Sequence, residues 1–214
     1  MALDAGFLAA IAAEFKQTAI GGRIEKVYQP ERDTVILQMR TFEGGKRLLI
    51  NAGSANPRIG FTAIPMENPQ NPPQFCVLLR KHLSGAKLLA VRQLDFERVL
   101  VLEFETRDEM GFLCKRMLFA EIMGKYSNMM FTDEKGKILA VLRPVDFSTS
   151  SMRQVLPGMT YELPPAQDKT DPLQVTREDF FAAFDEAPAG RPAHKWLLST
   201  YLGLHALQEE MHLP

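Results

Sequence analysis

Apolar residues recur at helical spacing near the start of the chain and at strand spacing after it. Repeats of three and four residues place side chains on one helix face. That face comprises Phe7, Leu8, Ile11, Ala12, Phe15 and Ala19. Asp4 can accept a hydrogen bond from the first turn, and Gly21-Gly22 supplies the glycine that commonly ends a helix. The chain therefore begins with an amphipathic helix.

Short apolar segments separated by turns follow in the middle of the chain. They predict strands at residues 23–29, 34–40, 47–51, 58–64, 87–93, 98–105, 115–122, 128–133 and 138–143. In the first strand, alternation would place Ile24 and Lys26 on one face. The turn at 133–136 predicts a hairpin between the last two strands.

A second helix interrupts this series. The proline-rich connection over 65–73 must be extended, and a helical pattern follows over 74–83. Its inward side chains would be Phe75, Val77 and Leu78, with Cys76 as a further candidate. This order of elements predicts an α+β fold, in which antiparallel sheets pack as a sandwich with a few helices.

The residue pattern changes twice in the C-terminal part of the chain. Prolines at 157, 164, 165 and 172 predict an extended crossing. Helical patterns return after Thr176, which can form a capping box with Asp179, and a last amphipathic stretch covers 195–211. We therefore expect a β-rich domain over 1–172 and a short helical segment over 173–214.

The composition is that of an ordinary globular protein, with 46% apolar and 24% charged residues. A formal net charge of -1 gives no bulk signature of nucleic-acid binding. However, eight acidic and four basic side chains follow residue 166, which leaves a net charge of about +3 for residues 1–166. This distribution permits a nucleic-acid partner without requiring one.

The cysteines and the N-terminus bear on metal binding and location. Cys76 and Cys114 are remote from each other and from any histidine pair, so we expect no zinc site and two reduced, buried thiols. We find no basic segment before an apolar run and no window of about 18 apolar residues. We therefore expect a cytoplasmic chain without a signal peptide or a membrane span.

Motifs of common catalytic sites are absent from the sequence. It contains no phosphate-binding loop, dinucleotide fingerprint, zinc-protease motif or nucleophile elbow. The four histidines are scattered. Glu103 and Glu105 lie on one predicted strand face, where a solvated edge explains them better than an acid/base pair. The sequence therefore favours binding over catalysis, with no cofactor and no metal.

Four stretches carry a resemblance to a known family. They are GGRIEKVYQP over 21–30, NPPQFCVLLRKHL over 71–83, EIMGKYSN over 121–128, and LPGMTYELPPAQDK over 156–169. In order and spacing they resemble the N-terminal domain of the NFACT family, across about residues 5–170. Residues 197–211 are similar to the start of the family's helix-hairpin-helix region. The family's coiled coil and C-terminal domain are missing, which implies a whole protein more than twice as long.

The resemblance implies a fold similar to the N-terminal domain of formamidopyrimidine DNA glycosylases and a function in ribosome quality control. Bacterial members of the family bind stalled large ribosomal subunits and recruit alanyl-tRNA, while peptide-bond chemistry belongs to the ribosome. We therefore expect tRNA and the large subunit as partners. Two rival functions are a fibronectin-binding adhesin, after the family's older name, and a glycosylase-like enzyme. Met1-Ala2-Leu3 offers no N-terminal proline nucleophile for the enzyme.

The resemblance also implies a tRNA-contacting pair. The family uses an acidic residue followed by arginine, usually Asp-Arg, and the matching residues here are Glu97 and Arg98. Arg98 offers a planar fork of donors to a phosphate or a base edge. The alternative is a surface ion pair worth under about 1 kcal/mol.

Four further residues are candidates for tRNA contact. Arg80 and Lys81 belong to a basic run that could follow an RNA backbone or form a solvated helix face. Lys125 and Asn128 belong to a turn that could meet RNA, or could cap itself through Ser127 and Asn128. Both descriptions of this turn can hold, with the turn presenting Lys125.

Overall fold

One nine-stranded antiparallel sheet forms the body of the protein in the computed structural model, which describes residues 3–165 and 167–204. The strand order is β4-β3-β2-β1-β5-β6-β7-β8-β9. The strands are β1 (Arg23–Glu31), β2 (Thr34–Thr41), β3 (Gly44–Asn51), β4 (Arg58–Phe61), β5 (Lys87–Gln93), β6 (Val99–Arg107), β7 (Leu113–Glu121), β8 (Asn128–Asp133) and β9 (Ile138–Val141). Every predicted strand is therefore present, with ends shifted by a few residues.

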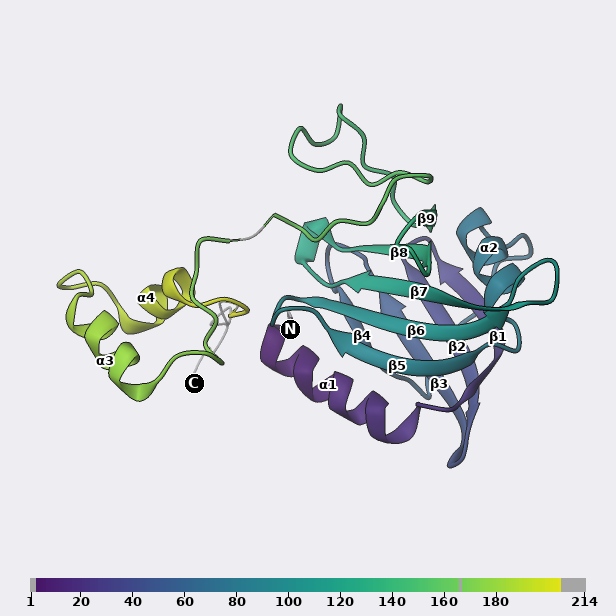
Figure 1. The fold of residues 1–214 in the computed structure, drawn as a ribbon, viewed down its shortest axis with the longest axis horizontal. Coiled ribbons are helices and arrows are strands. Elements are labelled where there is room, and N and C mark those ends of the chain that lie inside the picture. The colour runs from purple at the N-terminus through teal and green to yellow at the C-terminus, as the bar shows by residue number, and fades with distance from the viewer. Residues whose placement is uncertain (1–2, 166, 205–214) are drawn as a thin grey trace, which may run out of the picture.

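The sheet folds over between β1 and β5, so that β1–β4 form one layer and β5–β9 the other (Figure 1). These two strands share one paired position, Arg23 with Lys87. Apolar side chains of both layers and of two helices form one core cluster. The predicted α+β sandwich is confirmed, and its two layers are halves of a single bent sheet.

Helix α1 (Ala5–Thr18) lies along β5 (Figure 1). The Asp4 side chain caps it by accepting a hydrogen bond from the Phe7 amide at 2.8 Å. Its buried residues are Ala5, Leu8, Ala12 and Phe15, a narrower stripe than predicted. Phe7 falls beside that stripe and is half exposed, so its predicted place in the core is wrong.

Helix α2 (Gln74–Leu83) has the predicted bounds and packs against β1. Phe75, Cys76, Leu79 and Leu83 are buried. Val77 is half exposed, contrary to prediction, because it lies on the side of the helix away from the sheet. Burial raises the pKa of the Cys76 thiol, which keeps it protonated. The expected burial of Cys114 is only partly met.

A bulge in β1 breaks the simple alternation that the sequence predicts. The pairing of β1 with β2 shifts register between Ile24 and Lys26. The buried positions are therefore Ile24, Val27 and Gln29, and Lys26 is exposed rather than beside Ile24. An extra residue in one strand reverses the facing of the residues after it.

A second, smaller apolar cluster covers the outer face of β6, β7 and β8. It comprises Val99, Val101, Phe119, Met130, Ile138 and Val155. The extended segment after β9 supplies its cover, since Val155 pairs with Val145 and the Tyr161 ring stacks on Phe119 with centroids 3.8 Å apart. The predicted extended crossing therefore packs on the sheet.

Helices α3 (Arg177–Asp185) and α4 (Ala193–Thr200) follow this crossing. The predicted capping box of Thr176 and Asp179 is present. The predicted helix over 195–211 begins earlier, at Ala193, and ends at Thr200, and its residues 205–211 lie outside the described part of the chain. None of the described helices is both long and apolar enough to cross a bilayer.

The segment just after α4 contacts the start of α1 at Gly203. The Ala5 amide donates a hydrogen bond to the Gly203 carbonyl at 2.8 Å. Gly203 has a φ of +73°, and a Cβ there would lie 2.5 Å from the Ala5 Cβ and 3.0 Å from the Phe96 ring. Only glycine fits this contact without displacing a neighbour.

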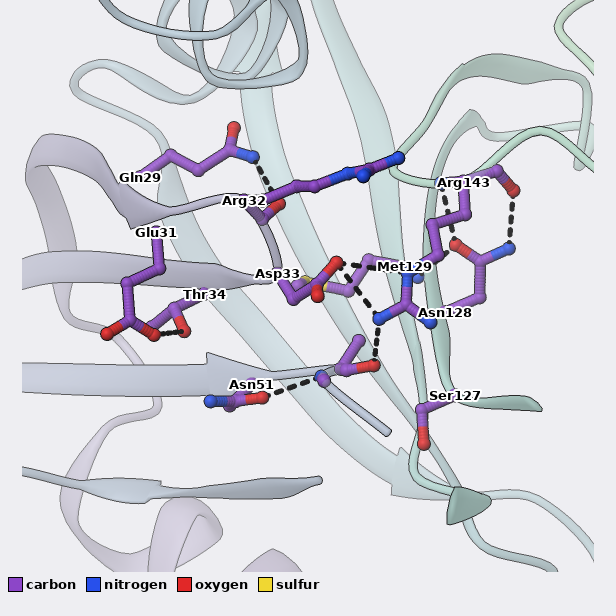
Figure 2. A network of polar contacts seen from close by, with 12 residues as sticks. Gln29, Glu31, Arg32, Asp33, Thr34, Asn51, Ser127, Asn128, Met129 and Arg143 are labelled. Carbon is purple, nitrogen blue, oxygen red and sulfur yellow. Dashed lines mark hydrogen bonds and ion pairs between the residues drawn. The ribbon is translucent and has the colours of Figure 1, made fainter. Parts of the chain in front are cut away.

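Arg143, which follows β9, joins the two layers (Figure 2). Its Nε donates to Asp33 Oδ1 at 3.0 Å, and its Nη2 donates to the Ala52 carbonyl. Its backbone N–H and C=O bond the Asn128 amide at 3.0 and 2.8 Å. One side chain thus ties the β1–β2 turn and the end of β3 to β8.

Replacing Arg143 by methionine should lower the free energy of unfolding by about 2 kcal/mol, because Asp33 and the Ala52 carbonyl lose a charged donor. Urea denaturation followed by circular dichroism measures this. Lys16→Met, an exposed cation of α1, is the matched control and should leave stability unchanged. Equal stability of the two variants would contradict the closing role of Arg143.

Candidate nucleic-acid interface

The turn between β5 and β6 presents the predicted pair Glu97 and Arg98. The Glu97 amide donates to the Leu94 carbonyl at 2.7 Å, and the Leu94 amide donates to Val99 at 3.1 Å. Asp95 and Phe96 both have positive φ, 43° and 52°. A phenylalanine in the left-handed region costs on the order of 1 kcal/mol or more. The contact of Phe96 with Gly203 helps to hold this conformation.

Arg98 lies where three elements meet. Its carbonyl accepts a hydrogen bond from the Ile122 amide at 2.8 Å, which places it beside the end of β7. Burial lowers the pKa of the half-buried Arg98 guanidinium, while the charges of Glu97 and Asp4 act in the opposite direction. An arginine in this setting keeps its positive charge. The site thus combines one half-buried cation with carboxylates from the turn and from the start of α1.

Gln93 ties this turn to α1. Its Nε2 donates to the Ala5 carbonyl and to the Glu97 carbonyl, both at 2.9 Å. The backbone of the pair is therefore held by β5, by α1 and by the end of β7, and both side chains are partly exposed.

Lys125 lies in the one-turn 3-10 helix η1 (Gly124–Tyr126), just after β7. The Met123 amide donates to Ser127 Oγ at 2.8 Å, so the turn caps itself. Gly124 has a φ of +60°, which favours glycine. Lys125 and Tyr126 are exposed, with Nζ 4.9 Å from the ring centroid. The turn therefore caps itself, and it also leaves Lys125 exposed at the surface.

Asn128 is buried, and its amide is used inside the protein. Its Oδ1 accepts from the Met129 and Arg143 amides at 2.9 and 3.0 Å, and its Nδ2 donates to the Arg143 carbonyl at 2.8 Å (Figure 2). Asn128 therefore fixes the strand end behind Lys125, and its side chain does not face outward as a predicted contact residue would.

Helix α2, which carries Arg80 and Lys81, lies at the other end of β6 from the β5–β6 turn that carries Arg98 (Figure 1). Arg80 Nε donates to the Val27 carbonyl at 2.7 Å, and Lys81 Nζ contacts Glu109 at 2.6 Å. The Thr106 hydroxyl of β6 donates to the next carbonyl in α2, that of His82. Eight residues of strand separate Arg98 from Thr106, or about 27 Å. The structure therefore brings Glu97, Arg98 and Lys125 to one end and leaves Arg80 and Lys81 apart.

A buried polar network lies under the Lys125 turn, and no motif in the sequence indicated it. Glu121 is 2% exposed and accepts from both terminal nitrogens of Arg153 at 3.1 and 2.8 Å. The Tyr161 hydroxyl donates to Glu121 at 3.0 Å. Burial, reinforced by the Glu121 charge, raises the pKa of Tyr161. This network anchors the crossing segment to the end of β7.

Within the described residues, no group of three or more His, Cys, Asp or Glu side chains is placed to hold a metal ion. The features available for recognition at the Arg98 end are therefore cationic, aromatic and carboxylate side chains on rigid turns. Such a set suits the phosphates, sugars and bases of a nucleic acid.

Comparison with known proteins identifies the family. The family model described as "NFACT N-terminal and middle domains" matches residues 4–211. The chain belongs to the NFACT family. The predicted domain boundary at residue 172 and the predicted tRNA contacts stay predictions.

Two relatives of this NFACT chain, one bacterial and one human, are named for ribosome quality control. It is 38% identical over 180 residues to the "Rqc2 homolog RqcH" of Bacillus subtilis, covering 84% of this chain and 32% of that protein. It is 27% identical over 136 residues to the human "Ribosome quality control complex subunit NEMF", covering 64% of this chain and 12% of that protein. The chain thus spans about a third or less of the length of these relatives.

A solved structure is also similar to this NFACT chain. The N-terminal domain of the fibronectin-binding protein PavA from Streptococcus pneumoniae superposes with a TM-score of 0.86 at 34% identity. The match covers 94% of this chain and 75% of that one. The expected fold is therefore shared with a solved member, and the name of that protein bears on the rival function of fibronectin binding.

The raised pKa of Tyr161 predicts a pH dependence of stability. The unfolded phenol loses its proton near pH 10, whereas the folded one keeps it, so stability falls as the pH rises above about 10. One such group adds at most about 1.4 kcal/mol per pH unit to the decrease in the free energy of unfolding. Tyr161→Phe should remove that part of the slope in denaturation measured between about pH 9 and pH 11.

Tyr126→Phe, which alters an exposed phenol, is the control and should keep the parental slope. If Tyr161→Phe and Tyr126→Phe show the same pH dependence, the Tyr161 phenol is not the group that resists ionisation in the folded protein.

Proposed function

We propose that this chain is the tRNA- and large-ribosomal-subunit-binding module of a bacterial ribosome quality control factor. In this proposal the factor works in the cytoplasm and recruits alanyl-tRNA for C-terminal alanine tailing of stalled nascent chains. The names of the relatives, which are ribosome quality control factors, support the cellular process. The observation that carries the RNA-binding part is the meeting of Glu97, Arg98 and the Lys125 turn at one end of the sheet.

The chemistry of these groups suits RNA. Arg98 can donate two parallel hydrogen bonds to a phosphate or to a guanine edge. The Tyr126 ring is 70% exposed beside Lys125, so an unpaired base can stack on the ring while the ammonium group meets a phosphate. Glu97 can accept a hydrogen bond from a base amine or a ribose hydroxyl.

The proposed role is holding, not catalysis. The Glu97, Arg98 and Lys125 side chains bind and orient the tRNA, and peptide-bond formation is left to the ribosome. Asn128 and the Glu121 network support the Lys125 turn from inside the protein.

A second candidate function is fibronectin binding, because the solved relative PavA is described as a fibronectin-binding protein. This alternative predicts saturable binding of the chain to immobilised fibronectin that does not depend on Arg98. The two functions therefore make different predictions for the same variant.

Arg98→Ala should weaken binding of labelled total tRNA by about tenfold or more, because one bidentate arginine contact is worth about 1–3 kcal/mol. Titration followed by fluorescence anisotropy at low and moderate salt measures this, and parental binding should fall as salt rises. Lys16→Ala, which removes an exposed cation of α1, is the control for net charge and should bind like the parent.

Equal losses in Arg98→Ala and Lys16→Ala would leave only nonspecific attraction and would remove Arg98 from the site. Absence of tRNA binding by the parent, together with Arg98-independent binding of fibronectin, would favour the second candidate function.

A further inference from the structure

Three cations lie side by side across the fold of the sheet. In the strand pairing, Arg23 of β1 lies directly opposite Arg40 of β2 and directly opposite Lys87 of β5. Directly paired residues point to the same face of a sheet, with Cβ atoms about 5 Å apart. The residues next in sequence, Ile24, Met39 and Leu88, are buried in the core, so the three cations face outward. We call Arg40, Arg23 and Lys87 the cation row.

The cation row is an unfavourable arrangement for the protein alone. Like charges placed directly opposite on neighbouring strands are destabilising, and here this occurs twice in succession. The repulsion falls where β1 and β5 share a single paired position, which is the narrowest joint of the sheet. Because this repulsion destabilises the joint between β1 and β5, we look for a binding partner that would explain the three cations.

Carboxylates do not neutralise the row within the described part of the chain. Other cations of the sheet have ion pairs, since Glu103 contacts Lys115 at 2.7 Å and Arg92 at 3.6 Å. No carboxylate oxygen of a described residue lies within 4.0 Å of a nitrogen of Arg23, Arg40 or Lys87. The row therefore retains three positive charges.

The two nearest candidate acids are placed differently. Glu105 is paired opposite Lys87 in the ladder, without an ion pair between them. Glu25 lies in the bulge of β1 and accepts from Gln38 at 3.3 Å. Neither carboxylate separates one cation of the row from the next.

The surface beside the row is open. Arg40 and Arg23 are exposed, and Lys87 is partly exposed. On the far side of Arg40, its partner in β3 is Gly45, and a Cβ added there would meet nothing within 4 Å. Arg23 uses one nitrogen to bond the Gly85 carbonyl at 3.1 Å, which fixes the guanidinium and leaves its other donors free of hydrogen bonds to described residues.

We propose that the cation row is a second RNA-backbone site, separate from Glu97 and Arg98, which binds consecutive phosphates of an RNA strand. Three cations on neighbouring strands, spaced by one strand separation of about 4.8 Å, match a polyanion better than a single small anion. The proposal rests on the RNA-binding function above but uses other residues. The phosphates could belong to tRNA or to ribosomal RNA, which share this chemistry.

The test compares two triple variants with the same change in net charge. Arg23→Gln/Arg40→Gln/Lys87→Gln removes the row, and Lys135→Gln/Lys137→Gln/Lys195→Gln removes three exposed cations of the β8–β9 turn and of α4. Binding of each protein to labelled total tRNA and to purified large ribosomal subunits is measured over a range of salt. Vesicles containing an anionic phospholipid form a third arm.

The row variant should bind at least one of the two RNA ligands about tenfold more weakly or worse, with the slope of log K against log salt reduced by about 2 to 3. The ligand that is affected identifies the source of the phosphates. The control variant should keep the parental slope. Arg40→Gln alone, at the open end of the row, should show a smaller loss and serves if the triple variant does not fold.

Other results would overturn the proposal. They are equal binding by row variant and parent to both RNA ligands, equal losses in row and control variants, or a loss confined to the vesicles, which would indicate a membrane surface. An unaffected row variant beside a weakened Arg98→Ala would leave the proposed function standing. Failure of the parent to bind either RNA would overturn both.

Discussion

Two apolar sheet faces meet in this protein because a single sheet bends at the joint between β1 and β5, where the ladder narrows to one pair of residues. The hydrophobic effect drives this closure, since the inner faces of both layers share one core with α1 and α2. Arg143, which follows β9 in one layer, ties that layer to Asp33 and Ala52 of the other. The bend also brings the β5–β6 turn beside the start of α1, where Gln93 links them.

Local features of the sequence predicted much of the fold. The bounds of α2, β5 and β8 agree with the predicted ranges, because helix caps, turns and alternation act over a few residues. Prediction was wrong where distant partners decide the outcome. The bulge in β1 is set by its register with β2, and the exposure of Phe7 and Val77 depends on which helix face meets the sheet.

The candidate site was likewise predicted in part from the sequence, while the rest depends on tertiary contacts. The resemblance to the family pointed to Glu97 and Arg98, but only the fold places Arg98 beside Ile122 and near Asp4. Asn128 looked like a contact residue because its turn is polar, and tertiary hydrogen bonds to Arg143 use its amide instead. Glu121 finds its partners 32 and 40 residues further on, within an irregular segment, and no rule of spacing could have paired them.

The contact at Gly203 has a mechanical consequence. Ala5 bonds the Gly203 carbonyl, and Phe96 lies against Gly203 with less room than one methyl group needs. Arg98 is two residues from Phe96, and Asp4 adjoins Ala5. A shift of Gly203, just after α4, would therefore displace Phe96 or Ala5 and so reach the neighbourhood of Arg98 without first deforming the hydrophobic core. Among the described residues, this contact is one direct route by which a movement of the C-terminal helices could alter the turn that carries Arg98.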